Sequence, residues 1–241
     1  MKSILKGKKV MVTAGPTREY LDPVRFITNE SSGKMGYAIA GTLYRHGVDV
    51  IMISGPVSIK PPIPAEKIIH VVSAEEMLEA CSQYFKIVDA VIFTAAVADY
   101  RPASWSGQKI KKTAQVQRLE FVKNPDIAYE FGKLKKEDQI SVGFALETDD
   151  IIDNAAKKLE KKNFDAIVIN SPNKEEGFGY DTNRIAIMRK DRTLKNFPLK
   201  PKKDIALDIL KELETLWTHN ILQPGSDPFP LEAGPGCHGD K

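Results

Sequence analysis

The apolar positions of this chain fall into short runs separated by longer amphipathic stretches. Three β-branched runs typical of buried strands lie at residues 9–14, 48–54 and 90–98. Two stretches with helical spacing lie between them, at residues 32–47 and 73–84. Gly47 has the position of a C′ glycine, and Ser73 with Glu76 forms a capping-box pattern. The order β-α-β-α-β predicts a parallel sheet with helices on both faces.

The second half continues the alternation after an interruption. Residues 101–123 show no strong helical period and contain several lysines, so we expect them to leave the sheet. Further strands are predicted at residues 140–146, 166–170 and 184–189, and further helices at residues 125–134, 149–162 and 205–217. Asn124 is the expected N-cap of the first of these helices. The predicted fold is α/β: a Rossmann-like, doubly wound, mainly parallel sheet with a flap excursion and a C-terminal strand and helix extension.

Length and composition narrow the class of protein. The chain has 241 residues, and its hydrophobic (42%) and charged (28%) fractions are those of a soluble globular protein. One domain over residues 1–219 is expected, followed by a Pro- and Gly-rich tail, residues 220–241, that is disordered or an expression remnant. A net charge of +3 does not favour nucleic-acid binding, and no apolar run approaches the ~20 residues of a membrane span. Two cysteines indicate no disulfide framework, which fits the cytoplasm.

A glycine follows the first predicted strand, in residues 13–18 (TAGPTR). Ligands of doubly wound sheets lie at the carboxyl ends of the strands, so the backbone at Gly15 can approach a ligand closely. A plain turn that ends the strand accounts for Gly15 equally well. The segment lacks the G-x-G-x-x-G pattern of dinucleotide-binding proteins.

The next predicted helix begins with two serines and a glycine, Ser31, Ser32 and Gly33, before Lys34. Hydroxyls, backbone N–H groups and the positive end of the helix dipole suit a phosphate. Capping of the helix by a serine explains the same residues at least as well. Met35 stands where a Walker A motif has Ser or Thr, so a P-loop is disfavoured.

Charged side chains follow in three further places. Asp99, at the end of the third predicted strand, could hold an amine or a hydroxyl, or could form an Asx-turn or an N-cap. Lys109 lies in a lysine-rich loop, residues 109–112, which is either a solvated face or a closing loop that neutralises developing charge. Lys158 and Lys162 are four residues apart on one predicted helix and should point the same way.

Taken together, seven segments resemble the phosphopantothenoylcysteine synthetase family in order and spacing. They are residues 15–19 (GPTRE), 22–29 (DPVRFITN), 31–36 (SSGKMG), 95–101 (AAVADYR), 109–112 (KIKK), 123–126 (KNPD) and 143–148 (GFALET). The resemblance runs from about residue 7 to about residue 217. It implies a ligase that activates 4′-phosphopantothenate with CTP, together with Mg²⁺, and then joins the acyl group to L-cysteine with release of CMP.

The resemblance also implies roles for individual residues. Lys109 resembles the flap lysine that stabilises charge during acyl-cytidylate formation, and Asn29 resembles the asparagine needed for turnover of that intermediate. The segments containing Gly15, Ser31, Ser32 and Gly33 match as well and offer the phosphate-binding features described above. The nucleotide-binding positions match Phe93, Thr94, Ala95, Asp99, Lys109, Asn124, Pro125, Asp126, Ile127, Phe144, Lys158 and Lys162. A homodimer is expected. The chain has no room for the decarboxylase that many bacteria fuse to this enzyme, so we expect either a monofunctional protein or an excised domain.

Two other classes of protein remain open on the sequence. A nicotinamide-dependent oxidoreductase would share the β-α-β-α-β beginning, although the glycine fingerprint is absent. A non-catalytic nucleotide-binding regulator would keep the pocket but would not need Lys109 and Asn29. Both residues are present, which favours an enzyme.

Overall fold

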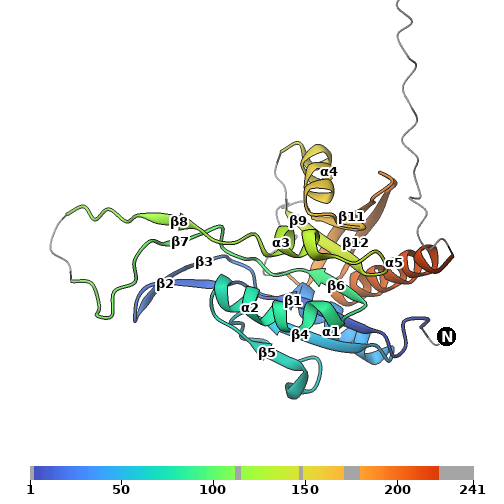
Figure 1. The fold of residues 1–241 in the computed structure, drawn as a ribbon, viewed down its shortest axis with the longest axis horizontal. Coiled ribbons are helices and arrows are strands. Elements are labelled where there is room, and N and C mark those ends of the chain that lie inside the picture. The colour runs from blue at the N-terminus through green and yellow to red at the C-terminus, as the bar shows by residue number, and fades with distance from the viewer. Residues whose placement is uncertain (1–2, 112–114, 147–148, 171–179, 223–241) are drawn as a thin grey trace, which may run out of the picture.

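A sheet of eight strands forms the centre of the computed structural model, which describes residues 3–111, 115–146, 149–170 and 180–222 (Figure 1). The strand order is β12-β11-β10-β9-β6-β1-β4-β5. The strands are β1 (Lys9–Ala14), β4 (Asp49–Ser54), β5 (Ile68–His70), β6 (Ala90–Phe93), β9 (Ile140–Leu146), β10 (Ala166–Asn170), β11 (Thr182–Arg189) and β12 (Leu194–Pro201). This arrangement confirms the predicted α/β class.

Parallel pairing extends from β5 to β10, whereas β11 and β12 pair antiparallel at one edge. The register sets Val12 of β1 beside Met52 on one side and Ile92 on the other. All three side chains are fully buried, as expected of parallel strands that are covered on both faces. The predicted C-terminal extension is therefore the antiparallel pair β11–β12 followed by a helix.

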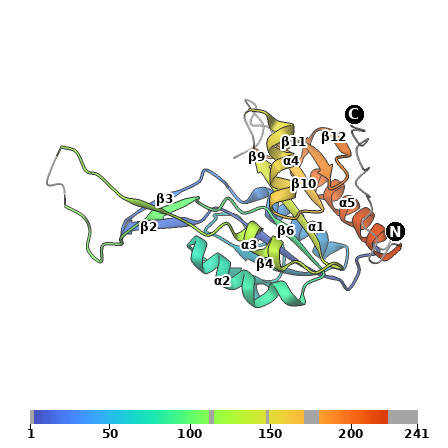
Figure 2. The same cartoon turned by 45° about the horizontal axis from the view of Figure 1, so that its top comes forward.

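Helices cover both faces of the sheet. Their bounds are α1 (Lys34–Arg45), α2 (Ala74–Tyr84), α3 (Ile127–Leu134), α4 (Ile151–Lys161), α5 (Lys202–Leu222) and two 3₁₀ turns, η1 (Ala65–Lys67) and η2 (Phe85–Ile87). α1 and α5 pack together on one face around Leu43 and Ile209. α2, α3 and α4 cover the other face around Met77, Phe131 and Leu159 (Figure 2). The fold is thus doubly wound.

Four predicted details differ from the structure. The third strand ends at Phe93 rather than Ala98, because the chain leaves the sheet as a loop. The N-cap of α3 is Asp126, which accepts the Tyr129 N–H, and not Asn124. β12 was not predicted because Pro198 and the polar residues Lys195, Asn196 and Lys200 break the strand pattern at this sheet edge. α5 continues to Leu222, so the predicted tail begins too early; residues 223–241 lie outside the described part.

Two small hairpin sheets project from the body and form what we call the arm, residues 18–28, 100–111 and 115–123 (Figure 1). One pairs β2 (Arg18–Asp22) with β3 (Arg25–Thr28), and the other pairs β7 (Tyr100–Pro102) with β8 (Phe121–Lys123). The second hairpin is the predicted excursion, which is confirmed; the first was not predicted, because its alternating pattern spans only a few residues.

A buried carboxylate, Asp22, ties the two parts of the arm together. It accepts the Arg25 guanidinium through Nε at 2.9 Å and the backbone N–H groups of Val24 and Ile110, each at 3.0 Å. The Arg25 guanidinium, and then these N–H groups, hold the pKa of Asp22 well below its usual range despite the opposing effect of burial. The loop that carries Lys109 is therefore anchored at the next residue, Ile110.

Within the residues that the structure describes, no helix is both long and apolar enough to cross a membrane.

Candidate active site

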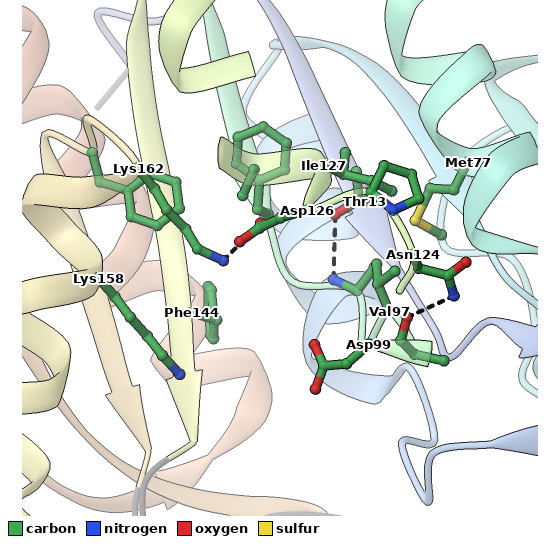
Figure 3. A pocket seen from close by; sticks show the side chains of 16 residues that line it. Thr13, Met77, Val97, Asp99, Asn124, Asp126, Ile127, Phe144, Lys158 and Lys162 are labelled. Carbon is green, nitrogen blue, oxygen red and sulfur yellow. Dashed lines mark hydrogen bonds and ion pairs between the residues drawn. The ribbon is translucent and has the colours of Figure 1, made fainter. Parts of the chain in front are cut away.

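A cavity of about 180 Å³ opens at the carboxyl ends of β1, β6 and β9 (Figure 3). The chain passes from β1 to β4 on one side and returns as β6 on the other, so this is the switch point of the sheet. Open α/β sheets bind ligands at such points. Ten of the predicted nucleotide-binding residues line the cavity: Phe93, Ala95, Asp99, Asn124, Pro125, Asp126, Ile127, Phe144, Lys158 and Lys162.

The loop after β6 is held by bonds from neighbouring elements. Thr13 Oγ1 accepts the Ala95 N–H at 3.3 Å, and Thr17 Oγ1 accepts the Ala98 N–H at 3.0 Å. Asn124 donates its side-chain amide to the Ala98 carbonyl at 2.8 Å, and its backbone N–H to the Asp99 carbonyl at 2.9 Å. Asn124 therefore shapes the cavity instead of capping α3.

Two lysines of α4 supply positive charge to this cavity. Lys158 and Lys162 both line it, which confirms the prediction that they point the same way. Lys162 pairs with Asp126 at 2.9 Å, and Asp126 also caps α3 (Figure 3). In the same view, Asp99 and Lys158 point into the open space on either side of Phe144. An aromatic ring between a carboxylate and an ammonium suits a polar, planar ligand.

A second cavity of about 350 Å³ adjoins the first and shares Ala95, Val97, Asp99, Phe144 and Lys158 with it. Its remaining lining includes the predicted residues Asn29, Ser31, Ser32, Gly33 and Thr94. A ligand that occupies both cavities would therefore extend from the nucleotide-binding residues to the N-terminus of α1.

The N-terminus of α1 is built on two glycines. Gly33, the N-cap, has φ +74°, and no side chain caps the helix. Ser31 Oγ accepts the Gly33 N–H at 3.3 Å, which is outside the helix, so the alternative that a serine caps this helix is wrong. Gly15 also has φ +74° and lies against Gly33, where an added Cβ on Gly33 would come within 3.2 Å of the Gly15 Cα. These glycines keep the helix end open to an anion.

Asn29 lies where the arm meets the body, directly after β3. Its amide Nδ2 donates to the Ala96 carbonyl at 3.0 Å, and the residue lines the second cavity. The side chain is therefore oriented by the loop after β6, within reach of a ligand in that cavity.

Lys109 is a predicted site residue that the structure does not bring to the cavities. It is exposed on the arm and lines neither of them. Gly15 lines neither cavity and acts through its contact with Gly33. Three residues of the matched segments, Lys112, Glu147 and Thr148, lie outside the described part of the chain.

Sequence reasoning missed a polar group on the far wall of the second cavity, formed by Asn170, Asn183 and Lys202. Asn170 and Asn183 belong to adjacent strands, and Lys202 begins α5. The only signal in the sequence was an asparagine at the end of a predicted strand, which is common in loops and turns.

Metal and thiol chemistry find little support in the described residues. Among them, no cluster of three His, Cys, Asp or Glu side chains could hold a metal ion. Burial raises the pKa of the Cys81 thiol to about 12, so this cysteine is protonated and unreactive.

Known proteins share this architecture. The model of the family described as "DNA/pantothenate metabolism flavoprotein C-terminal domain" matches residues 5–216. The chain is 47% identical over 213 residues to the "Coenzyme A biosynthesis bifunctional protein CoaBC" of Bacillus subtilis (strain 168), covering 88% of this chain and 52% of the relative. A "Cysteine/Cysteine sulfinic acid decarboxylase" of an unknown prokaryotic organism is 46% identical over 213 residues, covering 88% and 59%. The chain spans little more than half of each relative.

Two solved structures have the same fold as this chain. The C-terminal domain of a bifunctional CoaBC protein superposes with a TM-score of 0.75 at 40% identity, covering 89% of this chain and 98% of that domain. A mutant of Cab2 in complex with phosphopantothenate-cysteine shares the fold, with a TM-score of 0.70 at 16% identity, covering 90% of this chain and 89% of that chain. The chain therefore belongs to the DNA/pantothenate metabolism flavoprotein C-terminal domain family, which confirms its resemblance to the phosphopantothenoylcysteine synthetases.

Proposed function

We propose that this chain is a ligase that joins 4′-phosphopantothenate to L-cysteine in coenzyme A biosynthesis, with CTP as the co-substrate. The observation that carries the proposal is the pair of adjoining cavities. Ten predicted nucleotide-binding residues line the first, and Asn29 and the open end of α1 line the second. Family membership and the coenzyme A biosynthesis relative support the same pathway.

The proposed reaction has two balanced steps. A carboxylate oxygen of 4′-phosphopantothenate attacks the α-phosphorus of CTP, and the bond from that phosphorus to pyrophosphate breaks. The amine nitrogen of cysteine then attacks the acyl carbon, the bond to CMP breaks, and the amine proton passes to solvent. The first step joins two anionic groups and the second releases anionic CMP, so both need fixed positive charge and N–H donors in a site that holds the reactants together.

The residues of the cavities fit these requirements. Lys158 and Lys162 place two cations beside the nucleotide cavity, although Lys162 shares its charge with Asp126. The N-terminus of α1 presents N–H groups to a phosphate in the second cavity. Asn29 cannot serve as an acid or base near neutral pH, but its amide can orient an acyl carbonyl. We assign Asn29 to positioning of the acyl intermediate.

Magnesium enters this proposal as the counter-ion of the triphosphate. Its preference for oxygen ligands fits the Asp99 carboxylate, which lines both cavities. The ion would supply neutralisation of the phosphate charge, and the chain's own task is to hold the phosphates at the end of α1.

The test is an assay of CMP and pyrophosphate release with and without each acyl substrate. We expect pyrophosphate release to require 4′-phosphopantothenate, CMP release to require cysteine as well, and CTP to give a much higher kcat/KM than ATP. Release of neither product would refute the ligase. Comparable kcat/KM values for ATP and CTP would refute only the nucleotide preference.

We further propose that the chain acts as a homodimer through the arm. Large apolar side chains are exposed along it: Val24 (57%), Tyr100 (49%), Trp105 (63%), Phe121 (42%) and Val122 (40%). Exposed apolar side chains gathered in one region are typical of a protein interface. Packing of the arm against a second copy would also order the loop that carries Lys109.

Sedimentation of an arm variant tests this dimer. Trp105→Glu combined with Val122→Glu should shift the protein from dimer to monomer while the body stays folded, because charged side chains are depleted at interface cores. Leu134→Glu is the matched control, since Leu134 is also 63% exposed but lies on α3. A wild-type protein that sediments as a monomer would contradict the dimer, and so would a dimer that survives the double substitution.

A further inference from the structure

A polar cluster, which we call the far wall, lies at the carboxyl end of β10, the beginning of β11 and the beginning of α5. It consists of Asn170, Asn183 and Lys202, all of which line the second cavity. Asn170 shares its sheet face with Val168, two residues earlier, and both strands send their apolar residues on this face to the core under α1 and α5. At the ends of the strands that border the cavity, polar residues stand on this face in place of apolar ones.

Lys202 is a cation in an unfavourable place. The residue is only 8% exposed, and its ammonium donates to the Tyr180 carbonyl. Burial, and then the neighbouring Lys34 cation, lower the pKa of Lys202, while Asp181 raises it. Lys34 lines the same cavity from the first turn of α1. Two neighbouring cations facing one cavity favour an anionic ligand.

Asn183 gives an independent indication of a ligand. The residue is 2% exposed, and its side-chain Oδ1 has no hydrogen-bond partner within the described part of the protein. The Oδ1 of Asn170 is buried and unpartnered in the same way. Buried polar atoms of native proteins are nearly always bonded, so two unpartnered acceptors on one cavity wall indicate a missing donor.

The position of the far wall identifies which part of the ligand reaches it. A nucleotide bound by Asp99, Phe144 and Lys158 would extend from the first cavity into the second, since both cavities share these residues. The far wall and the uncapped end of α1 line that second cavity, beyond the shared residues. The phosphates furthest from the nucleoside are the part of a triphosphate that can reach it.

We propose that Lys202, with Lys34, binds the pyrophosphate end of the nucleoside triphosphate, and that Asn170 and Asn183 accept hydrogen bonds from the water ligands of its magnesium ion. This inference rests on the proposed function and deepens it. It explains the lysines, because phosphate oxygens need cations, and it explains the two asparagine oxygens, because magnesium-bound waters are hydrogen-bond donors. Lys202 is thereby a binding residue for the leaving group of the first step.

One carboxylate competes with such an anion. Asp181 pairs with Lys34 at 2.7 Å, but the Asp181 side chain is 87% exposed and can turn into solvent when phosphate arrives. Lys202 has no such exposed position and stays in the wall. The substitution that tests the subsite is therefore made at Lys202.

Calorimetric titration with CTP and with CMP, each with magnesium, separates this subsite from the rest of the nucleotide site. Lys202→Met should weaken CTP binding about tenfold to a hundredfold, the range for loss of a hydrogen bond to a charged group. CMP lacks the pyrophosphate, so its affinity should not change. Lys203→Met is the matched control, because Lys203 is adjacent but exposed and lines neither cavity.

Asn183→Asp serves as the second variant in case Lys202→Met does not fold. It keeps the shape of the side chain and adds negative charge at the far wall, so CTP binding should weaken while CMP binding is unchanged. Equal loss of CTP and CMP affinity, or no loss of either, in the folded variants would overturn the subsite. Wild-type protein that binds neither nucleotide would instead refute the proposed function, and with it the inference.

Discussion

The body and the arm use apolar residues in opposite ways. In the body, Val12, Met52 and Ile92 lie side by side on three parallel strands and are fully buried. On the arm, Trp105 and Val122 are 63% and 40% exposed. The body thus buries its apolar surface within one chain, whereas the arm leaves apolar side chains exposed. Stability should therefore depend on the body, and assembly and loop position on the arm.

The largest effect of a single substitution is expected at Asn29, which lies where the arm meets the body. Asn29→Asp replaces the Nδ2 donor to the Ala96 carbonyl with a negative charge beside an anionic intermediate. Loss of one preorganised donor typically costs ~10²–10³ in rate, so the cysteine-dependent step should slow by that factor and acyl-cytidylate should accumulate. The measurement is mass spectrometry of a quenched reaction followed by a cysteine chase. Discharge at the wild-type rate would reduce Asn29 to a residue that shapes the loop.

The body and the arm should differ in how much a substitution changes the free energy of unfolding. Ile92→Ala should lower the free energy of unfolding by about 2–5 kcal/mol, because it leaves a cavity in the centre of the sheet. Val122→Ala on the arm should change it by less than about 0.5 kcal/mol in a monomeric background, as exposed substitutions do. Urea unfolding of both variants measures the difference. Equal losses would mean that the arm is part of the folding core.

Lys109 tests whether the arm contributes to chemistry. Lys109→Gln removes an exposed charge, so the fold should be unaffected, while pyrophosphate release should slow about tenfold to a hundredfold if the loop closes on the site. Arg118→Gln, another exposed cation between β7 and β8, is the control and should leave the rate unchanged. Single-turnover kinetics of pyrophosphate release distinguish the two. A wild-type rate for Lys109→Gln would remove the arm from the mechanism.

The smallest effect is expected at Asp22, which anchors the loop. The pKa of this carboxyl is lowered in the folded state, so its stabilising contribution is present above the unfolded pKa of about 3.9 and is lost as the pH falls below it. The difference in melting temperature between the wild type and Asp22→Asn should be constant from pH 6 to 8 and should narrow below about pH 4. A difference that grows in acid would show that the Arg25 pair is not its source.

Most of the body followed from its sequence. Continuous β-branched runs such as that around Val12, with helical periods between them and signals such as Gly47 and Ser73, indicated the order of elements, and right-handed crossover restricted the topology. Asn29 and Lys158 were identified as site residues through family resemblance, and the structure brings both to the cavities. Local period and end signals are properties of neighbouring residues, which is why a sequence can carry them.

What only the tertiary structure decided was which distant residues share a surface. The far wall joins Asn170, Asn183 and Lys202 from three elements, and their convergence depends on strand register and on where α5 begins. The hairpin held by Asp22 needed the contact with Ile110, 88 positions away. Such pairings depend on long-range packing and hydrogen bonds, and no local period encodes them.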